Sequence, residues 1–288
     1  MEPILEVCGL TKRYPGFELK DVSFRLEHGY VMGLIGANGA GKTTIIKLIL
    51  NLVRKDSGEV RIFGQDHLQN EASLRERIGV VHEAPPFYDH LSAGAFARLV
   101  GRFYTRWNDQ TFRRLSDEFE LPLSKRIRTF SRGMKMKLAL AMALSHEAEL
   151  LLLDEPTGGL DPVFRRELLD RLRDLLQDER VSVLFSTHLT SDLERITDYV
   201  TLVRRGRLLF SESVDVIRDT WCIAKGGNDL LVPDVRRLFR ACREEPFGFT
   251  ALSDRPQEVR RALGPKVVLG KPALSDLVRY LEEENGHV

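Results

Sequence analysis

Hydrophobic positions follow two different periods along the first two hundred residues. Apolar residues 22, 24 and 26 alternate with polar neighbours, which predicts a half-buried strand. Continuous apolar runs predict buried strands at residues 31–35, 78–81, 150–153 and 181–185, and residues 45–52 are predicted as a buried helix. Leucines at helical spacing from residue 168 predict a helix between the last two strands. This alternation of strands and helices indicates an α/β fold with a parallel sheet covered on both faces.

Three further regions depart from this rhythm. Residues 91–147 show few strand patterns and are predicted as an inserted helical subdomain. Residues 200–203 and 208–211 predict a hairpin that closes a first domain over residues 1–215. Residues 216–288 predict a small α+β appendage, with strands at 221–224, 249–252 and 267–269 and helices at 235–242 and from residue 274. The sequence shows no chemistry in this appendage.

Composition and charge limit the classes of protein. The 288 residues are 43% hydrophobic and 30% charged, which is typical of a globular protein. The formal net charge of +1 argues against a non-specific nucleic-acid binder, so no nucleic-acid partner is expected. The three cysteines are far apart and indicate neither a disulfide framework nor a metal knuckle. We expect no signal peptide and no transmembrane segment, so a role at a membrane would need another chain to span it.

A phosphate-binding loop follows the predicted strand 31–35. Its residues, in the pattern G-x-x-x-x-G-K-[ST], are Gly36, Ala37, Asn38, Gly39, Ala40, Gly41, Lys42, Thr43 and Thr44. Glycines let the backbone approach phosphates, and the N–H groups at the start of the next helix attract anions. Lys42 is expected to reach the β- and γ-phosphates and Thr43 to bind Mg²⁺. The alternative, a glycine-rich turn with a surface lysine, explains this strand–loop–helix context poorly.

Two acids and a histidine follow later strands. Asp154 and Glu155 come directly after four leucines, where Asp154 can hold Mg²⁺ and Glu155 can activate an attacking water. A surface acid pair at a turn is the alternative, and the buried strand before it makes that less favoured. His188 follows the strand 181–185, and we favour a γ-phosphate contact over a purely structural role.

Taken in order, these motifs resemble the nucleotide-binding subunits of ABC transporters. The resemblance covers residues 3–215 and implies an ABC-type P-loop NTPase fold with an N-terminal antiparallel β part, ATP as substrate and Mg²⁺ as cofactor. Each motif has a counterpart here: Tyr14 in the adenine-stacking loop, Gly36 to Thr44 as Walker A, Phe130 to Met134 as the signature, Leu150 to Glu155 as Walker B, Asp161 in the D-loop and His188 as the switch histidine.

The signature segment is also predicted to form the start of a helix. Ser131 is predicted as the N-cap of a helix, whose N-terminus favours an anion. The resemblance implies that this anion is the γ-phosphate bound to an opposite subunit, contacted by Ser131 and Gly133, in a homodimer or a heterodimer. Arg132 and Met134 depart from the usual glycine and glutamine, and Glu83 stands where glutamine is common. Glu83 could reach the metal through water or pair with a basic group, and an ordinary loop acid is an equally weighted alternative.

Within the family, the residues after Phe130 and Ser186 resemble the bacterial YtrB and bacitracin-resistance branch. That branch implies an ATPase peripheral to the cytoplasmic face of the membrane, which powers a separate permease, with export favoured and the substrate unknown. One alternative is a soluble ABC ATPase acting on ribosomes or DNA. A P-loop GTPase or kinase is another, and the Ser131–Gly133 signature argues against it.

Overall fold

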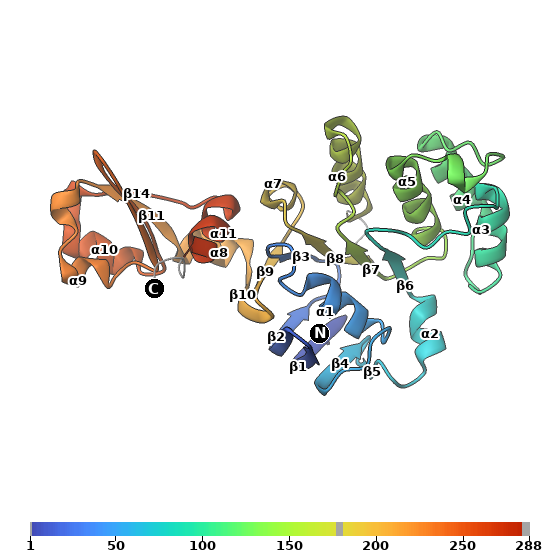
Figure 1. Cartoon of the computed structure of the whole chain (residues 1–288), viewed down its shortest axis with the longest axis horizontal. Coiled ribbons are helices and arrows are strands. Elements are labelled where there is room, and N and C mark those ends of the chain that lie inside the picture. Colours follow the sequence, from blue (N-terminus) through green and yellow to red (C-terminus); the bar gives the residue numbers. More distant parts are fainter. Residues whose placement is uncertain (1, 177–180, 284–288) are drawn as a thin grey trace.

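The computed structural model describes residues 2–176 and 181–283, which form three β-sheets with helices packed around them (Figure 1). Residues 284–288 of the predicted appendage therefore lie outside the described part. Figure 1 shows the C-terminal elements at one end of the molecule and helices α3 to α5 at the other, with the central sheet between them.

A six-stranded sheet forms the centre, in the order β10-β9-β3-β8-β7-β6. All neighbours are parallel except the β9–β10 hairpin. The strands are β3 (Val31–Ile35), β6 (Ile78–Val81), β7 (Leu150–Asp154), β8 (Ser182–Thr187), β9 (Tyr199–Arg204) and β10 (Arg207–Ser213). Every residue of β3, β7 and β8 is buried, which explains their continuous apolar runs. The predicted parallel sheet is confirmed.

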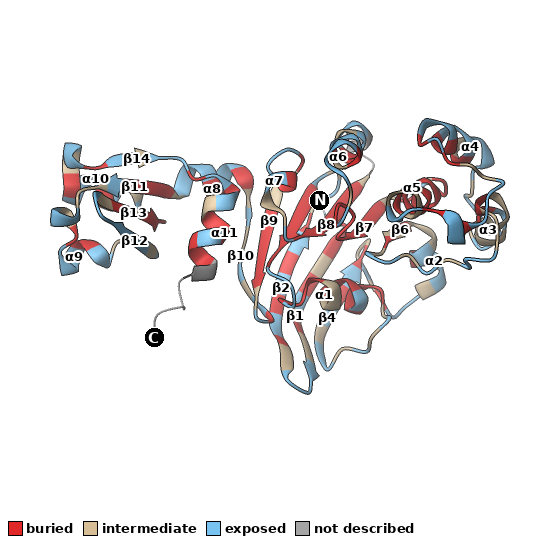
Figure 2. Ribbon diagram, turned by 45° about the horizontal axis from the view of Figure 1, so that its top comes forward, coloured by how far each residue is buried: buried red, intermediate tan, exposed pale blue. Residues whose placement is uncertain are grey.

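The two faces of this sheet are covered by different layers. Leu151 and Phe185 belong to an apolar cluster shared with α5 and α6, whereas Leu152 and Leu184 belong to a cluster shared with α1 and the N-terminal strands. Because side chains alternate along a strand, each strand contributes to both clusters. Figure 2 shows this burial along the central strands.

Helix α1 (Lys42–Ile49) lies between the central sheet and the N-terminal sheet and corresponds to the helix predicted at 45–52. Both predicted ends were wrong. The helix begins at Lys42, because the phosphate-binding loop leads directly into it. It ends at Ile49, because Asn51 takes a left-handed φ of 52°, a conformation that asparagine adopts more readily than most residues.

The N-terminal antiparallel sheet has the order β2-β1-β4-β5. Its strands are β1 (Leu5–Tyr14), β2 (Phe17–Leu26), β4 (Ser57–Ile62) and β5 (Gln65–Asp66), and α2 (Glu71–Glu76) leads from it into β6. The antiparallel β part implied by the resemblance is confirmed.

Helices dominate residues 91–147. They are α3 (Ala93–Gly101), α4 (Asp109–Glu118), the 3₁₀ turn η1 (Ile127–Thr129) and α5 (Arg132–Ala143). Side chains of Ser92, Asn108 and Ser131 accept hydrogen bonds from backbone N–H groups at the starts of α3, α4 and α5. Helix α6 (Pro162–Leu176) follows β7, and α7 (Thr190–Leu193) follows β8.

A third sheet, in the order β12-β13-β11-β14, forms the C-terminal part. Its elements are α8 (Val214–Thr220), β11 (Cys222–Gly226), η2 (Asn228–Leu230), α9 (Pro233–Arg236), β12 (Ala241–Glu245), β13 (Gly248–Ser253), α10 (Pro256–Leu263), η3 (Gly264–Lys266), β14 (Val268–Gly270) and α11 (Leu274–Glu283). Helix α8 runs across the domain boundary predicted at residue 215.

The helix predicted at 235–242 was wrong for residues 237–242, which are not helical. Helix α9 ends at Arg236, and Arg240 N donates to Leu252 O at 2.8 Å, where strand pairing begins. Leu238 and Phe239, which lie in the turn after α9, both pack against the apolar cluster of the C-terminal sheet. Further along the chain, helix α11 packs back on α7 and on the central cluster through Leu277 and Leu281.

Along the described residues, no helix combines the length and the apolar character needed to cross a bilayer.

Candidate nucleotide-binding site

The loop between β3 and α1 is seated against the β9–β10 hairpin. A Cβ atom on Gly36 would lie 2.2 Å from Val203 O, so only glycine fits this close approach. Gly206 N, in the hairpin turn, donates to Ala40 O at 2.9 Å. Gly41 takes a φ of 116° at the start of α1, which again favours glycine. The loop therefore has a fixed shape, with a helix N-terminus at its end that suits phosphate.

Lys42 is buried and folds back over its own loop. Its Nζ atom donates to Gly36 O at 2.7 Å and to Ala37 O at 3.3 Å, and it forms an ion pair with Glu155 Oε1 at 3.1 Å. The ammonium group is thus held by two carbonyls and one carboxylate, the type of partner that a phosphate could replace.

Asp154 connects the start of α1 to the end of β8. Thr43 Oγ1 donates to Asp154 Oδ1 at 3.1 Å, and Ser186 Oγ donates to the same oxygen at 2.7 Å. Asp154 is buried at the last position of β7. The sequence had placed Thr43 and Asp154 at one metal site, and the structure brings them together. Ser186 was not predicted as a site residue, and only its place at the end of a buried strand could have indicated it.

The Thr43 hydroxyl and the Asp154 carboxylate are hard oxygen donors, which suit Mg²⁺. Among the described residues, no three His, Cys, Asp or Glu side chains gather as a metal-binding group. A magnesium ion bound with a nucleotide needs few protein ligands, because phosphates and water complete its coordination. The residues present fit such an ion.

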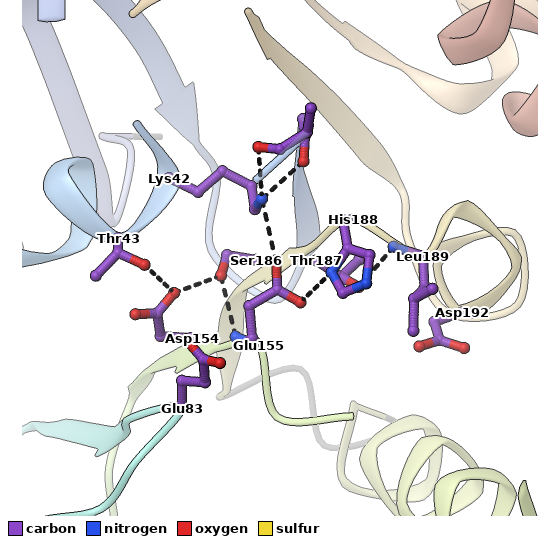
Figure 3. A network of polar contacts seen from close by, with 12 residues as sticks. Lys42, Thr43, Glu83, Asp154, Glu155, Ser186, Thr187, His188, Leu189 and Asp192 are labelled. Atoms are coloured by element: carbon purple, nitrogen blue, oxygen red, sulfur yellow. Dashed lines mark hydrogen bonds and ion pairs between the residues drawn. The ribbon is translucent and has the colours of Figure 1, made fainter. Parts of the chain in front are cut away.

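Glu155 occupies a constrained position next to Asp154. Its φ of 48° is left-handed, which is rare for a residue with a side chain and is often found at functional sites. Its backbone N–H donates to Ser186 O and Oγ, both at 3.1 Å. Glu155 Oε2 lies 2.9 Å from His188 Nδ1, so the carboxylate bridges Lys42 and His188 (Figure 3).

These residues line a pocket of about 530 Å³. Its wall consists of Phe17, Asn38, Gly39, Gly41, Lys42, Thr43, Thr44, Glu83, Glu155, Gly158 and His188. Tyr14, the predicted adenine platform, is not part of this wall. Its ring centroid lies 6.5 Å from that of Phe17, the residue opposite it in the β1–β2 hairpin. The structure therefore gives Phe17 the aromatic position at the pocket.

The signature and D-loop residues lie outside the wall of this pocket. Ser131 Oγ accepts a hydrogen bond from Met134 N at 3.2 Å, so its prediction as an N-cap is confirmed. Asp161 caps α6 in the same way, with Oδ1 accepting from Phe164 N at 3.0 Å. The proline after Asp161 could have indicated this cap. Gly133 faces the start of α6, where a Cβ atom would lie 3.7 Å from Phe164.

Two of the three residues that depart from the family pattern, Arg132 and Glu83, contact each other. Arg132 Nη2 lies 3.5 Å from Glu83 Oε1, and both side chains are about half exposed. Glu83 lines the pocket and forms this ion pair, while its metal-binding role stays a prediction. The pair connects the loop after β6 to the start of α5.

The fold and this site define a P-loop nucleotide-binding protein. The ABC transporter family matches residues 19–158. The bacitracin transport ATP-binding protein BcrA of Bacillus licheniformis is 34% identical over 73% of this chain and 69% of its own length. The ABC transporter ATP-binding protein YtrB of Bacillus subtilis is 29% identical over 76% of this chain and 75% of its own length. A solved ATP-binding subunit of an ABC transporter is 31% identical, with a TM-score of 0.67 over 75% of this chain and 92% of that one.

The chain therefore belongs to the ATP-binding proteins of ABC transporters, whose subunits are ATPases. The predicted resemblance to the bacitracin-resistance and YtrB branch is confirmed. The match also disfavours a GTPase or kinase.

Proposed function

We propose that this chain hydrolyses ATP to power export through a separate membrane permease, at the cytoplasmic face of the membrane. The observation that carries the proposal is the bridge from the buried Lys42 through the buried Glu155 to the more exposed His188, beside the phosphate-binding loop. Family membership supports the ATPase part, and the absence of a membrane-crossing helix among the described residues is compatible with a separate permease.

The site suggests how its residues act on ATP. A γ-phosphate at the loop would compete with Glu155 for Lys42, because both offer anionic oxygens to one ammonium group. The carboxylate released from Lys42 can then accept a proton from a water aligned for attack on the γ-phosphorus. In this structure His188 pairs with Glu155. With ATP bound, His188 would instead donate a hydrogen bond to a γ-phosphate oxygen. Bound Mg²⁺, held by Thr43 and Asp154, would neutralise charge on the phosphates.

We further propose that two subunits, identical or not, enclose each nucleotide. Ser131 and Gly133 lie at the start of α5 and outside the pocket wall, and Ser131 is exposed. A helix N-terminus presented to solvent is suited to an anion bound by another subunit. In this arrangement Ser131 and Gly133 of one subunit complete the ATP site of the other, and Asp161 lies at the contact between them.

The segment after Glu83 is our proposed contact with the permease. It continues with two prolines, Phe87 and Tyr88, and the Tyr88 side chain is exposed. The rings of Phe87 and Tyr88 both pack edge-on against Phe96 of α3, which ties this surface to the helical segment. An exposed aromatic group next to the ATP site suits a partner that must respond to the nucleotide.

Export is the favoured direction because the resemblance of the sequence to the bacitracin-resistance and YtrB branch implies it, although the names of BcrA and YtrB state no direction. The relatives reported above have transport names and give no support to an alternative role on ribosomes or DNA.

The proposal can be tested by capture of the partner. A tagged Glu155→Gln variant would be expressed in its native cell, extracted from membranes with detergent in Mg-ATP, and its partners identified by mass spectrometry. We expect a multi-spanning protein in a fixed ratio to the chain. Recovery of ribosomes or DNA with no membrane protein would contradict transport and leave the ATPase chemistry intact.

A further inference from the structure

A second buried carboxylate lies just beyond the switch histidine. Asp192, in the short helix α7, is only 2% exposed. Arg165 Nε, from α6, donates to Asp192 Oδ1 at 2.6 Å, and Arg165 Nη2 forms an ion pair with the same oxygen. Arg165 Nη2 also donates to Ser191 Oγ at 3.0 Å. Two helices that follow different site motifs are thus joined by one ion pair, in which Asp192 is buried and Arg165 is 27% exposed.

The cost of this pair indicates that stability alone does not explain it. Among the described residues, Asp192 Oδ2 has no hydrogen-bond partner. A buried carboxylate loses the solvation of both oxygens, and a well-packed apolar pair in its place is often as stable or more so. A buried charge that is only half satisfied therefore calls for another reason, such as fixing the position of α7.

Helix α7 needs external contacts to hold its place. It has four residues, fewer than a helix needs to be stable alone. Leu193 anchors it against β3, where a Cβ atom on Gly33 would lie 2.9 Å from the Leu193 side chain. Asp192 anchors it to α6 through Arg165. Loss of the second anchor would let the helix turn about the first.

His188 depends on this anchoring because its own side chain is weakly held. The imidazole is 38% exposed, and its Nδ1 atom contacts Glu155. The backbone after it is tied closely to α7, since Leu189 N donates to Thr187 Oγ1 at 2.9 Å and Asp192 N donates to Leu189 O at 3.1 Å. Figure 3 shows Asp192 next to Leu189, directly beyond the histidine.

We propose that Arg165 and Asp192 are positioning residues that hold His188 at the γ-phosphate during hydrolysis. This inference rests on the proposed role of His188. Arg165 lies in α6, one turn after Asp161, which caps that helix. The Arg165–Asp192 pair therefore makes the orientation of His188 depend on the position of α6. When the phosphate takes the place of the Glu155 contact, α7 remains as the support that orients the imidazole.

The test is a double-mutant cycle on steady-state and single-turnover ATP hydrolysis. Asp192→Asn keeps the size of the side chain and an oxygen for Arg165, and it removes the charge. We expect kcat to fall about ten- to a hundredfold, since small misplacements of catalytic groups have effects of this size, with KM nearly unchanged. In a His188→Ala background, the same change should produce no further loss. Arg166→Gln, an exposed neighbour on α6, is the matched control and should match the parent.

Equal losses from Asp192→Asn in both backgrounds, or no loss in the parent, would overturn the proposal. If Asp192→Asn does not fold, Arg165→Lys keeps the charge, removes the forked contact and is judged by the same cycle. A parent that hydrolyses ATP without supporting transport would contradict the proposed function and leave this test valid.

Discussion

The ammonium group of Lys42 lies 3.1 Å from Oε1 of Glu155, and both side chains are buried. The lysine proposed to bind phosphate is thus held by the residue proposed to activate water. If both roles hold, a phosphate that binds Lys42 would displace Glu155, because one ammonium group cannot fully satisfy both anions in a buried site. Binding of ATP would then release the base.

Replacement of Glu155 by Gln should separate binding from turnover. We expect kcat to fall by at least about a hundredfold, the usual contribution of a general base. ATP should bind as tightly as to the parent or more tightly, because the competing charge at Lys42 is gone. Phosphate release and titration with a fluorescent ATP analogue measure the two effects. Glu167→Gln, at an exposed position of α6, is the control, and near-parental turnover by Glu155→Gln would show that Glu155 is not the base.

The aromatic group at the pocket should be Phe17 and not Tyr14. Phe17→Ala should weaken ATP binding by about 1 to 3 kcal/mol, the range found for loss of a base–aromatic stack. Tyr14→Ala should have a smaller effect, since its ring lies outside the pocket wall. Calorimetric titration of both variants decides between them, with thermal unfolding as a check because Phe17 also packs on the core. A larger loss from Tyr14→Ala would restore the prediction made from the sequence.

Much of the central sheet could be predicted because its strands are buried on both faces. Strands such as β3 and β7 appear in the sequence as uninterrupted apolar runs. Strand β12 could not be predicted in this way, since four of its five residues are exposed and it shows no alternation. The start of α1 was missed for a different reason, because its first turn belongs to the phosphate-binding loop and carries polar residues.

The site could be predicted where its residues form local motifs or follow buried strands. The phosphate-binding loop and the Asp154–Glu155 pair are of the first kind, and His188 is of the second. Contacts between distant segments left no local pattern, as for Arg165 with Asp192 and for Glu83 with Arg132. Phe17 was missed because a single aromatic residue in a strand gives no sign of which pocket it faces.

The Glu83–Arg132 pair should contribute little to stability. Both side chains are about half exposed and the closest atoms are 3.5 Å apart, so a double-mutant cycle with Glu83→Gln and Arg132→Gln should give less than about 1 kcal/mol. The coupling should shrink further at about 1 M salt, where exposed charges are screened. Urea unfolding of the parent and the three variants, at low and at high salt, measures the coupling free energy and its dependence on salt.

A second pair in the chain provides the comparison. Arg77 and Glu149 form two hydrogen bonds, at 2.9 and 2.6 Å, and are less exposed. Arg77, followed by Arg106, lowers the pKa of Glu149 despite its partial burial. The same cycle on this pair should give a larger coupling free energy. A larger coupling free energy for Glu83–Arg132 than for Arg77–Glu149 would contradict this prediction. It would mean that the Glu83–Arg132 ion pair stabilises the fold.

Stability should fall as the pH is lowered, in part because of His146. Burial lowers the pKa of this imidazole below its ordinary value, and its Nδ1 atom lies 3.0 Å from Glu76 O while the ring stacks on Tyr104. The unfolded chain therefore takes up a proton at a higher pH than the folded chain does. The free energy of unfolding should begin to fall near about pH 6.5, by at most about 1.4 kcal/mol per pH unit for one histidine.

His146→Gln keeps an N–H donor for Glu76 O and cannot titrate, so the pH dependence should weaken. It should not vanish, because burial also lowers the pKa of His67, which adds a change of the same sign. Urea unfolding at several values between about pH 7.5 and 5.5 measures the slope. His28→Gln, at an exposed position, is the matched control. A slope unchanged in His146→Gln would mean that the folded and unfolded chains bind a proton at this histidine equally well.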